Sequence, residues 1–140
     1  MRWFTPLALA AVAMVAAASH ADAAAALELT LLPDQVSYRS GQPIGLTLNV
    51  VNRSSEVVAL RFRTSQRFDF IIRDATGVEH WRASSDEMFA QAIGDERLAP
   101  GTVLVYRAQC AVTLAPGTYS VEGAVVAEHR HATSATIRVD

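Results

Sequence analysis

Apolar and polar side chains alternate along most of this chain, in short runs that are separated by residues typical of turns. In one such run, Ile44, Leu46, Leu48 and Val50 alternate with small or polar residues. A period of two is typical of β-strands with one buried face. The runs that we expect to form strands are 27–31, 44–50, 58–62, 67–74, 78–81, 104–110, 119–125 and 135–139. This pattern predicts an all-β, immunoglobulin-like antiparallel β-sandwich of seven to eight strands.

The stretch 67–81 is the clearest β-hairpin in the pattern. Asp74 and Gly77 bracket a tight reversal, where glycine allows a positive φ angle. Trp81 ends the return strand and shares its alternation with Ala83. We therefore expect Trp81 to be a core residue.

One segment departs from the period of two and predicts a single short helical insertion. Ser84 and Glu87 have the spacing of a capping box, and Gly94 is a natural helix terminator. Between them, Met88, Phe89, Ala92 and Ile93 form an apolar stripe at helical spacing. We expect this stripe to cover the core rather than to form a binding groove.

The hairpin and its flanks resemble the BsuPI-type intracellular proteinase inhibitor domain over about residues 43–126. The motifs that carry the resemblance are Asn52-Arg53-Ser54, Thr64-Ser65-Gln66, Phe68-Asp69-Phe70, Asp74-Ala75-Thr76-Gly77, Trp81-Arg82-Ala83-Ser84, Phe89-Ala90-Gln91, Leu98-Ala99-Pro100-Gly101 and Pro116-Gly117-Thr118-Tyr119. Ala83 stands where the family pattern has a second tryptophan. The resemblance implies a β-sandwich that inhibits a serine peptidase.

The first 23 residues have the features of a bacterial signal peptide. Arg2 provides the positive start, an apolar run follows over 7–18, and Ala21-Asp22-Ala23 is a small-residue cleavage site. A competing site, Ser19-His20-Ala21, lies two residues earlier. The apolar run is shorter than the roughly 20 residues of a membrane span. We expect an exported protein, periplasmic or secreted, whose residues 24–140 form a single domain without a membrane span.

Charge and cysteine content exclude several classes of function. The formal net charge is −2, and the 12 basic residues, all arginine, are scattered along the chain. Nucleic-acid binding requires a clustered positive face, so we expect no nucleic-acid partner. Cys110 is the only cysteine and continues the apolar face of the 104–110 run. We expect it to be a buried packing residue rather than a reactive thiol.

Residue types that are catalytic in other proteins do not form a catalytic pattern in this sequence. His80 is interpreted as an exposed strand histidine, because no Gly-x-Ser-x-Gly motif accompanies it. Asp74 is interpreted as a turn former, and Asp69 as a polar-face partner for Arg67 or Arg61. We expect no enzymatic activity.

No cofactor is expected, although one pair of histidines makes a metal site a weak alternative. His129 and His131 would share a face if both lay on a strand, but their segment also has the composition of a polar hairpin turn. A structural zinc site uses four ligands, and the spacing supplies no third or fourth. A periplasmic metal-handling domain is therefore the least favoured alternative.

These observations predict a monomeric, exported, non-enzymatic module that binds a protein, with a serine peptidase as the partner that the resemblance implies. The alternative from another class is a structural or assembly module of the bacterial cell envelope. The candidate partner-binding residues are Thr64, Ser65, Gln66 and Arg67, in a polar turn between strands, together with Arg82 after Trp81. Loops on a rigid sandwich are where such modules bind.

Overall fold

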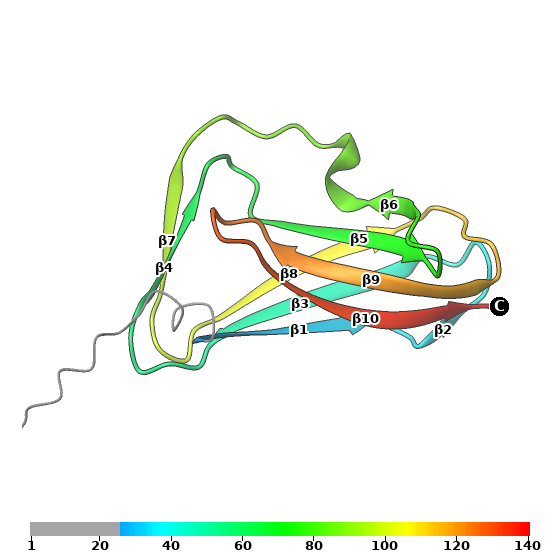
Figure 1. The fold of residues 1–140 in the computed structure, drawn as a ribbon, viewed down its shortest axis with the longest axis horizontal. Helices are drawn as coiled ribbons and strands as arrows, with labels where there is room; N and C mark the ends of the chain where they lie inside the picture. The colour runs from blue at the N-terminus through cyan, green and yellow to red at the C-terminus, as the bar shows by residue number, and fades with distance from the viewer. Residues whose placement is uncertain (1–25) are drawn as a thin grey trace, which may run out of the picture.

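The computed structural model describes residues 26–140, and the expected signal peptide lies outside them (Figure 1). The strands are β1 (Leu27–Pro33), β2 (Ser37–Tyr38), β3 (Ile44–Asn52), β4 (Val58–Phe62), β5 (Phe68–Asp74), β6 (Glu79–Arg82), β7 (Gly94–Leu98), β8 (Val103–Cys110), β9 (Gly117–Val125) and β10 (His131–Val139). A single 3-10 turn, η1 (Ala83–Asp86), follows β6. No helix within 26–140 is long and apolar enough to cross a membrane.

The strands form a β-sandwich, as the alternation predicted. One sheet has the order β1-β3-β8, and the facing sheet has the order β2-β10-β9-β5-β6. Neighbouring strands are antiparallel except for β2, which runs parallel to β10. A separate pair, β4-β7, crosses one end of the sandwich, at the left of Figure 1. The segment from η1 to β7 arches away from the body and runs from the side of β6 to that end.

The core lies between the two sheets and consists of the inward residues of the alternating runs. In β3, every second residue from Ile44 to Asn52 is buried. Gly123 of β9 shows how closely the sheets approach. A Cβ atom at this position would lie 3.3 Å from methyl groups of Leu31 and Leu48 and 3.4 Å from the Phe70 ring. The absence of a side chain at Gly123 thus permits dense packing at the centre.

The central hairpin forms as predicted. Asp74 accepts a hydrogen bond from the Gly77 N–H, and Gly77 has φ +87°. The Asp74 carboxylate also accepts hydrogen bonds from Thr76 and Val78, so it closes the turn. Hydrogen bonds to this carboxylate lower the pKa of Asp74; the bond from the Thr76 hydroxyl has the largest effect, and the contact with the His80 ring has the next largest. The expectation of a turn-forming aspartate is therefore confirmed.

Cys110 is fully buried at the end of β8, as its position on the apolar face indicated. Burial raises the pKa of its thiol, and the backbone N–H of Val112 opposes that effect only in part. Tyr119 has the hydrogen bond of a tyrosine corner, because its hydroxyl donates to the carbonyl of Ala115, four residues upstream (2.6 Å).

The predicted short helical insertion is present as η1, but it ends at Asp86 and does not extend over the apolar stripe 88–93. Only η1 is helical; Glu87 is already extended, and no side chain caps the turn. Met88 and Ile93 of the expected apolar stripe are exposed rather than packed on the core. Gly94 begins β7 instead of ending a helix. The physical reason is that Ser84 turns its hydroxyl to a buried carboxylate of β5, described below, instead of to the backbone N–H of Glu87.

The fold leads to a prediction about two aromatic side chains. Phe70 is fully buried, whereas Trp81, opposite Ile72 on the core face, is only half-buried against the core. We expect Phe70→Ala to lower the free energy of unfolding by about 3–5 kcal/mol and Trp81→Ala by about 2 kcal/mol. Urea denaturation of both variants measures this. A Trp81→Ala variant with the wild-type midpoint would show that the ring does not pack on the core.

Candidate partner-binding site

A buried carboxylate joins β5 to the segment that follows β6. Asp69 points to the outer face of its sheet, opposite Phe70, yet only 3% of it is exposed. Its oxygens accept hydrogen bonds from the Ser84 hydroxyl (2.6 Å), the Ser84 N–H (3.1 Å) and Nη1 of Arg82 (3.2 Å). Its charge is thus compensated where water is excluded, as a buried carboxylate requires.

The expectation that Asp69 pairs with Arg67 or Arg61 is wrong. Arg67 precedes β5 and donates from Nε to Glu96 of β7 (2.9 Å) and from Nη1 to the carbonyl of Thr64 (2.8 Å). Its guanidinium also lies 4.3 Å from the centre of the Phe62 ring. Arg67 therefore ties the polar turn to the β4-β7 pair.

The same polar turn holds the segment after η1 by a reciprocal pair of hydrogen bonds between Ser65 and Ala90, one to a backbone carbonyl and one to a side-chain hydroxyl. The Ser65 N–H donates to the Ala90 carbonyl (2.9 Å), and the Ala90 N–H donates to the Ser65 hydroxyl (2.8 Å). Within the turn, the Gln66 N–H donates to the Thr64 hydroxyl, and the Gln66 amide donates to the Phe68 carbonyl. The turn is thus a formed structure.

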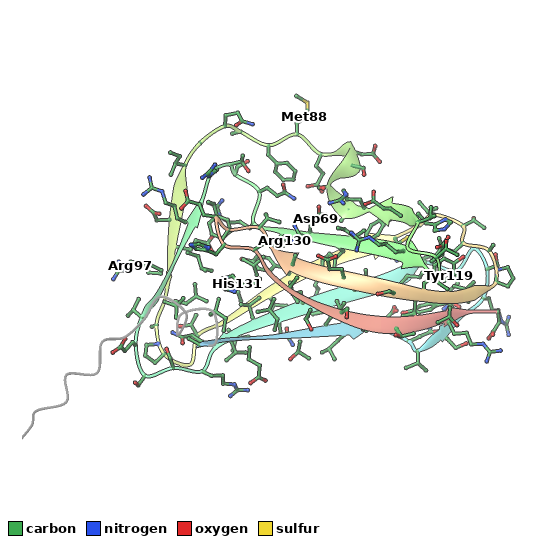
Figure 2. All side chains as sticks on the ribbon, viewed as in Figure 1. Asp69, Met88, Arg97, Tyr119, Arg130 and His131 are labelled. Carbon is green, nitrogen blue, oxygen red and sulfur yellow. The ribbon has the colours of Figure 1, made fainter. Side chains whose placement is uncertain are left out.

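Between these two attachments the chain leaves η1 with an extended residue, Glu87, and Glu87 and Met88 are open to solvent. Glu87 has φ −107° and ψ 148°, and the Met88 side chain is 99% exposed. Figure 2 shows Met88 at the outer edge of this stretch, pointing away from the sandwich, with Asp69 near the start of β5. Ile93, at the other end, is 64% exposed. We call residues 87–93 the presented segment.

The five candidate binding residues flank this segment. Thr64, Ser65, Gln66 and Arg67 support its middle and its far end, and Arg82 supports its beginning through Asp69. Their participation in binding stays a prediction. Sequence reasoning missed Asp69 as an anchor and Met88 as an exposed residue, because charge at Asp69 indicated solvent and spacing at Met88 indicated a helix.

The histidines remain apart. His80 lies exposed on β6 with its Nε2 2.7 Å from an Asp74 oxygen, and its ring meets Tyr119 edge-on at 5.6 Å. His131 begins β10, whereas His129 lies in the preceding turn, so the two do not share a strand face. Across residues 26–140, no group of three or more histidine, cysteine, aspartate or glutamate side chains could hold a metal ion.

A shallow depression of about 280 Å³ lies on the outer face of the five-stranded sheet. Its charged groups bind one another: Glu122 accepts from Arg73 at 2.7 Å and from Arg130 at 2.8 Å. Burial opposes ionisation of Glu122, but the two guanidinium groups outweigh it, and the pKa of Glu122 is lowered. Because these charges are already paired, the depression is a weaker candidate for partner binding than the presented segment.

The family model BsuPI, described as intracellular proteinase inhibitor, matches residues 31–130. The chain belongs to the BsuPI family. The resemblance inferred from the motifs is confirmed. No curated protein matches the chain.

Solved structures similar to this BsuPI-family chain support the β-sandwich fold. Spo0M, the sporulation control protein from Bacillus subtilis, aligns with TM-score 0.54 and 14% identity over 82% of the chain. The chain spans about half of Spo0M, 49% of its length. The C-terminal domain of Wzt gives 0.51 and 14% identity, over 82% of the chain and 74% of that domain. The alkylpurine DNA glycosylase AlkC from Pseudomonas fluorescens gives 0.50 and 15% identity, over 81% of the chain and 30% of that enzyme. At these identities the likeness concerns the fold alone.

Substitution of Asp69 tests its role as an anchor. Glu79 pairs with the same arginine, Arg82, and its substitution is the matched control. Asp69→Asn removes the charge that Arg82 and Ser84 bind, and we expect a loss of about 1.5–3 kcal/mol in the free energy of unfolding. Glu79→Gln removes the exposed partner of Arg82 and should leave the urea midpoint nearly unchanged.

Asp69→Asn should also speed proteolysis within 84–93, because the first attachment of this stretch is lost. Urea denaturation and limited proteolysis measure the two effects. The anchor role would be contradicted if Asp69→Asn matched the wild type in both.

Proposed function

We propose that this BsuPI-family protein is a non-enzymatic inhibitor of a serine peptidase and that the presented segment forms its binding face. The observation that carries the proposal is the presented segment itself. It begins with extended backbone at Glu87, it is mostly exposed to solvent, and it is attached before its start, by Ser84 to Asp69, and in its middle, by Ala90 to Ser65. Family membership supports a peptidase as the partner.

The physical argument concerns the cost of ordering on binding. A flexible loop loses conformational freedom when a partner holds it, which weakens binding. The attachments at Ser84 and Ala90 restrict the presented segment before any partner arrives. An extended peptide can add to the partner as a strand, with main-chain hydrogen bonds for affinity and side-chain pockets for specificity. This geometry suits the cleft of a peptidase, which receives extended chains.

The candidate residues of the polar turn have a defined place in this proposal. Thr64 to Arg67 lie beside the middle of the presented segment and form the adjoining part of the face, and Arg82 stands on its other side. Pre-organised inhibitors change little on binding, so the surface described here is the one the partner meets.

A second candidate function, a structural module of the cell envelope, is favoured by one different feature. β8 is one of the two edge strands of the three-stranded sheet, and its Val103 and Val105 side chains are exposed on the outer face. An exposed edge can accept a strand from another chain. Its occupant would bind at β8 and leave the presented segment free.

We also propose that the protein is exported as a monomer and that residues 24–140 form the single mature domain. The support is the sequence pattern of residues 1–23. The description of the family as intracellular stands against this part of the proposal. N-terminal sequencing of protein from the cell-envelope fraction should begin at Ala24, or at Asp22 if the competing site is used. An intact Met1 terminus on cytosolic protein would contradict export.

Inhibition is tested by titrating the purified protein against subtilisin, chymotrypsin and trypsin, with peptide substrates. We expect stoichiometric, reversible loss of activity for at least one of them. The variant Val105→Arg, which alters the β8 edge, is the matched control. It should inhibit as strongly as the wild type does. Full activity of all three peptidases at a large molar excess of the protein would refute the proposed function.

A further inference from the structure

We infer that Met88 is the residue that enters the specificity pocket of the peptidase, so that the target is a serine peptidase with an apolar pocket. This inference rests on the proposed function and names the residue and the partner chemistry that it requires.

The first observation is the exposure of Met88. A methionine side chain that is 99% exposed keeps its full apolar surface in water, and burying it in a partner would stabilise the complex. The next most exposed large apolar side chain in the described part of the chain is Val36, at 82%. Val36 lies in the connection between β1 and β2, outside the presented segment.

The second observation is the position of Met88 between the two attachments. Ser84 is fixed to Asp69 four residues before it, and Ala90 is fixed to Ser65 two residues after it. The preceding residue, Glu87, has extended backbone angles. A peptidase can therefore approach the Met88 carbonyl from solvent while the chain on either side stays in place.

The chemistry of Met88 defines the pocket. Methionine is long, unbranched and uncharged, and it fills an apolar slot of the kind found in chymotrypsin. It offers no positive charge to the aspartate at the base of the trypsin pocket. Asp86 and Glu87 precede Met88, so the surface that receives them must be neutral or basic.

The attachment at Ala90 explains how such a segment can inhibit rather than be consumed. In acylation, the serine oxygen of the peptidase bonds to the Met88 carbonyl carbon, and the bond from that carbon to the Phe89 nitrogen breaks. The peptidase histidine takes the serine proton and passes it to the departing Phe89 amine. Because the next residue, Ala90, is bound to Ser65 by two hydrogen bonds, the amine stays near the acyl group. It can then reform the peptide bond, with the proton returned to the serine, before water hydrolyses the acyl-enzyme.

The test uses purified wild-type protein and three variants, titrated against subtilisin, chymotrypsin and trypsin. Towards a peptidase that the wild type inhibits, Met88→Ala should weaken inhibition by about 10- to 100-fold, which corresponds to the loss of one buried apolar side chain. Met88→Arg should lose inhibition of chymotrypsin and gain inhibition of trypsin. The control Val36→Ala, which truncates the other highly exposed apolar residue, should leave inhibition unchanged.

A second measurement examines the attachment independently of affinity. Ser65→Ala removes the acceptor of the Ala90 N–H and should speed cleavage between Met88 and Phe89 by about fivefold or more, the factor that one hydrogen bond represents. Mass spectrometry of the incubated mixture locates the cleavage. Ser55→Ala, an exposed serine in the β3–β4 connection, is the matched control.

The outcomes separate the inference from the proposed function. If the wild type inhibits a peptidase and Met88→Ala inhibits it equally well, the inference is overturned and the proposed function stands. If the wild type inhibits none of the three, both are overturned. A switch from chymotrypsin to trypsin in Met88→Arg supports both.

Discussion

The buried carboxylate of Asp69 is the constraint on which the arrangement of the binding face depends. It lies on the face of the five-stranded sheet that is turned away from the core, where a charge would ordinarily be solvated. The end of β6 and the 3-10 turn close over it, and both Ser84 and Arg82 bind it. An unpaired charge in that position would cost several kcal/mol, so the carboxylate favours the conformation in which these two residues cover it. The direction of the chain after η1 follows from that closure.

The rest of the molecule provides a rigid support for this arrangement. The two sheets approach closely at Gly123, where Leu31 and Leu48 of the facing sheet and the ring of Phe70 on β5 all surround the glycine. The strand that carries Phe70 also carries Asp69, and residues 69–72 of this strand are all buried, so the anchor belongs to a well-packed element of the fold. At the other end, Arg67 links the polar turn to β7 through Glu96 and so fixes where the presented segment rejoins the sandwich. A segment held this way can be exposed without being loose.

Much of the fold could be predicted because its strands bury one face against a common core. Alternation identified β1, β3, β4, β5, β8, β9 and β10, and the turn chemistry of Asp74 and Gly77 identified the hairpin. β7 was missed because only Leu98 of its five residues is buried, so its sequence carries no period of two in apolar residues. β2 was missed because two residues are too few to show any period.

The candidate site was predicted less completely, for a reason that is also physical. The polar turn was located, but the partners of its residues depend on contacts between segments far apart in sequence, such as Ser65 with Ala90. Helical spacing of Met88, Phe89, Ala92 and Ile93 was a local signal that tertiary contacts overrode. The charge of Asp69 likewise indicated solvent, because local sequence does not show that Ser84 and Arg82 fold back over it.

The most direct test of this account is amide hydrogen exchange of the protein with and without an inhibited peptidase. The account predicts that added protection falls on residues 87–93 and on the adjoining turn at 64–67, because a bound peptidase would shield the exposed backbone there. The strands of the three-stranded sheet, including the β8 edge, should exchange as in the free protein. Protection confined to β8, with the exchange of residues 87–93 unchanged, would contradict the account and would favour strand addition at the sheet edge.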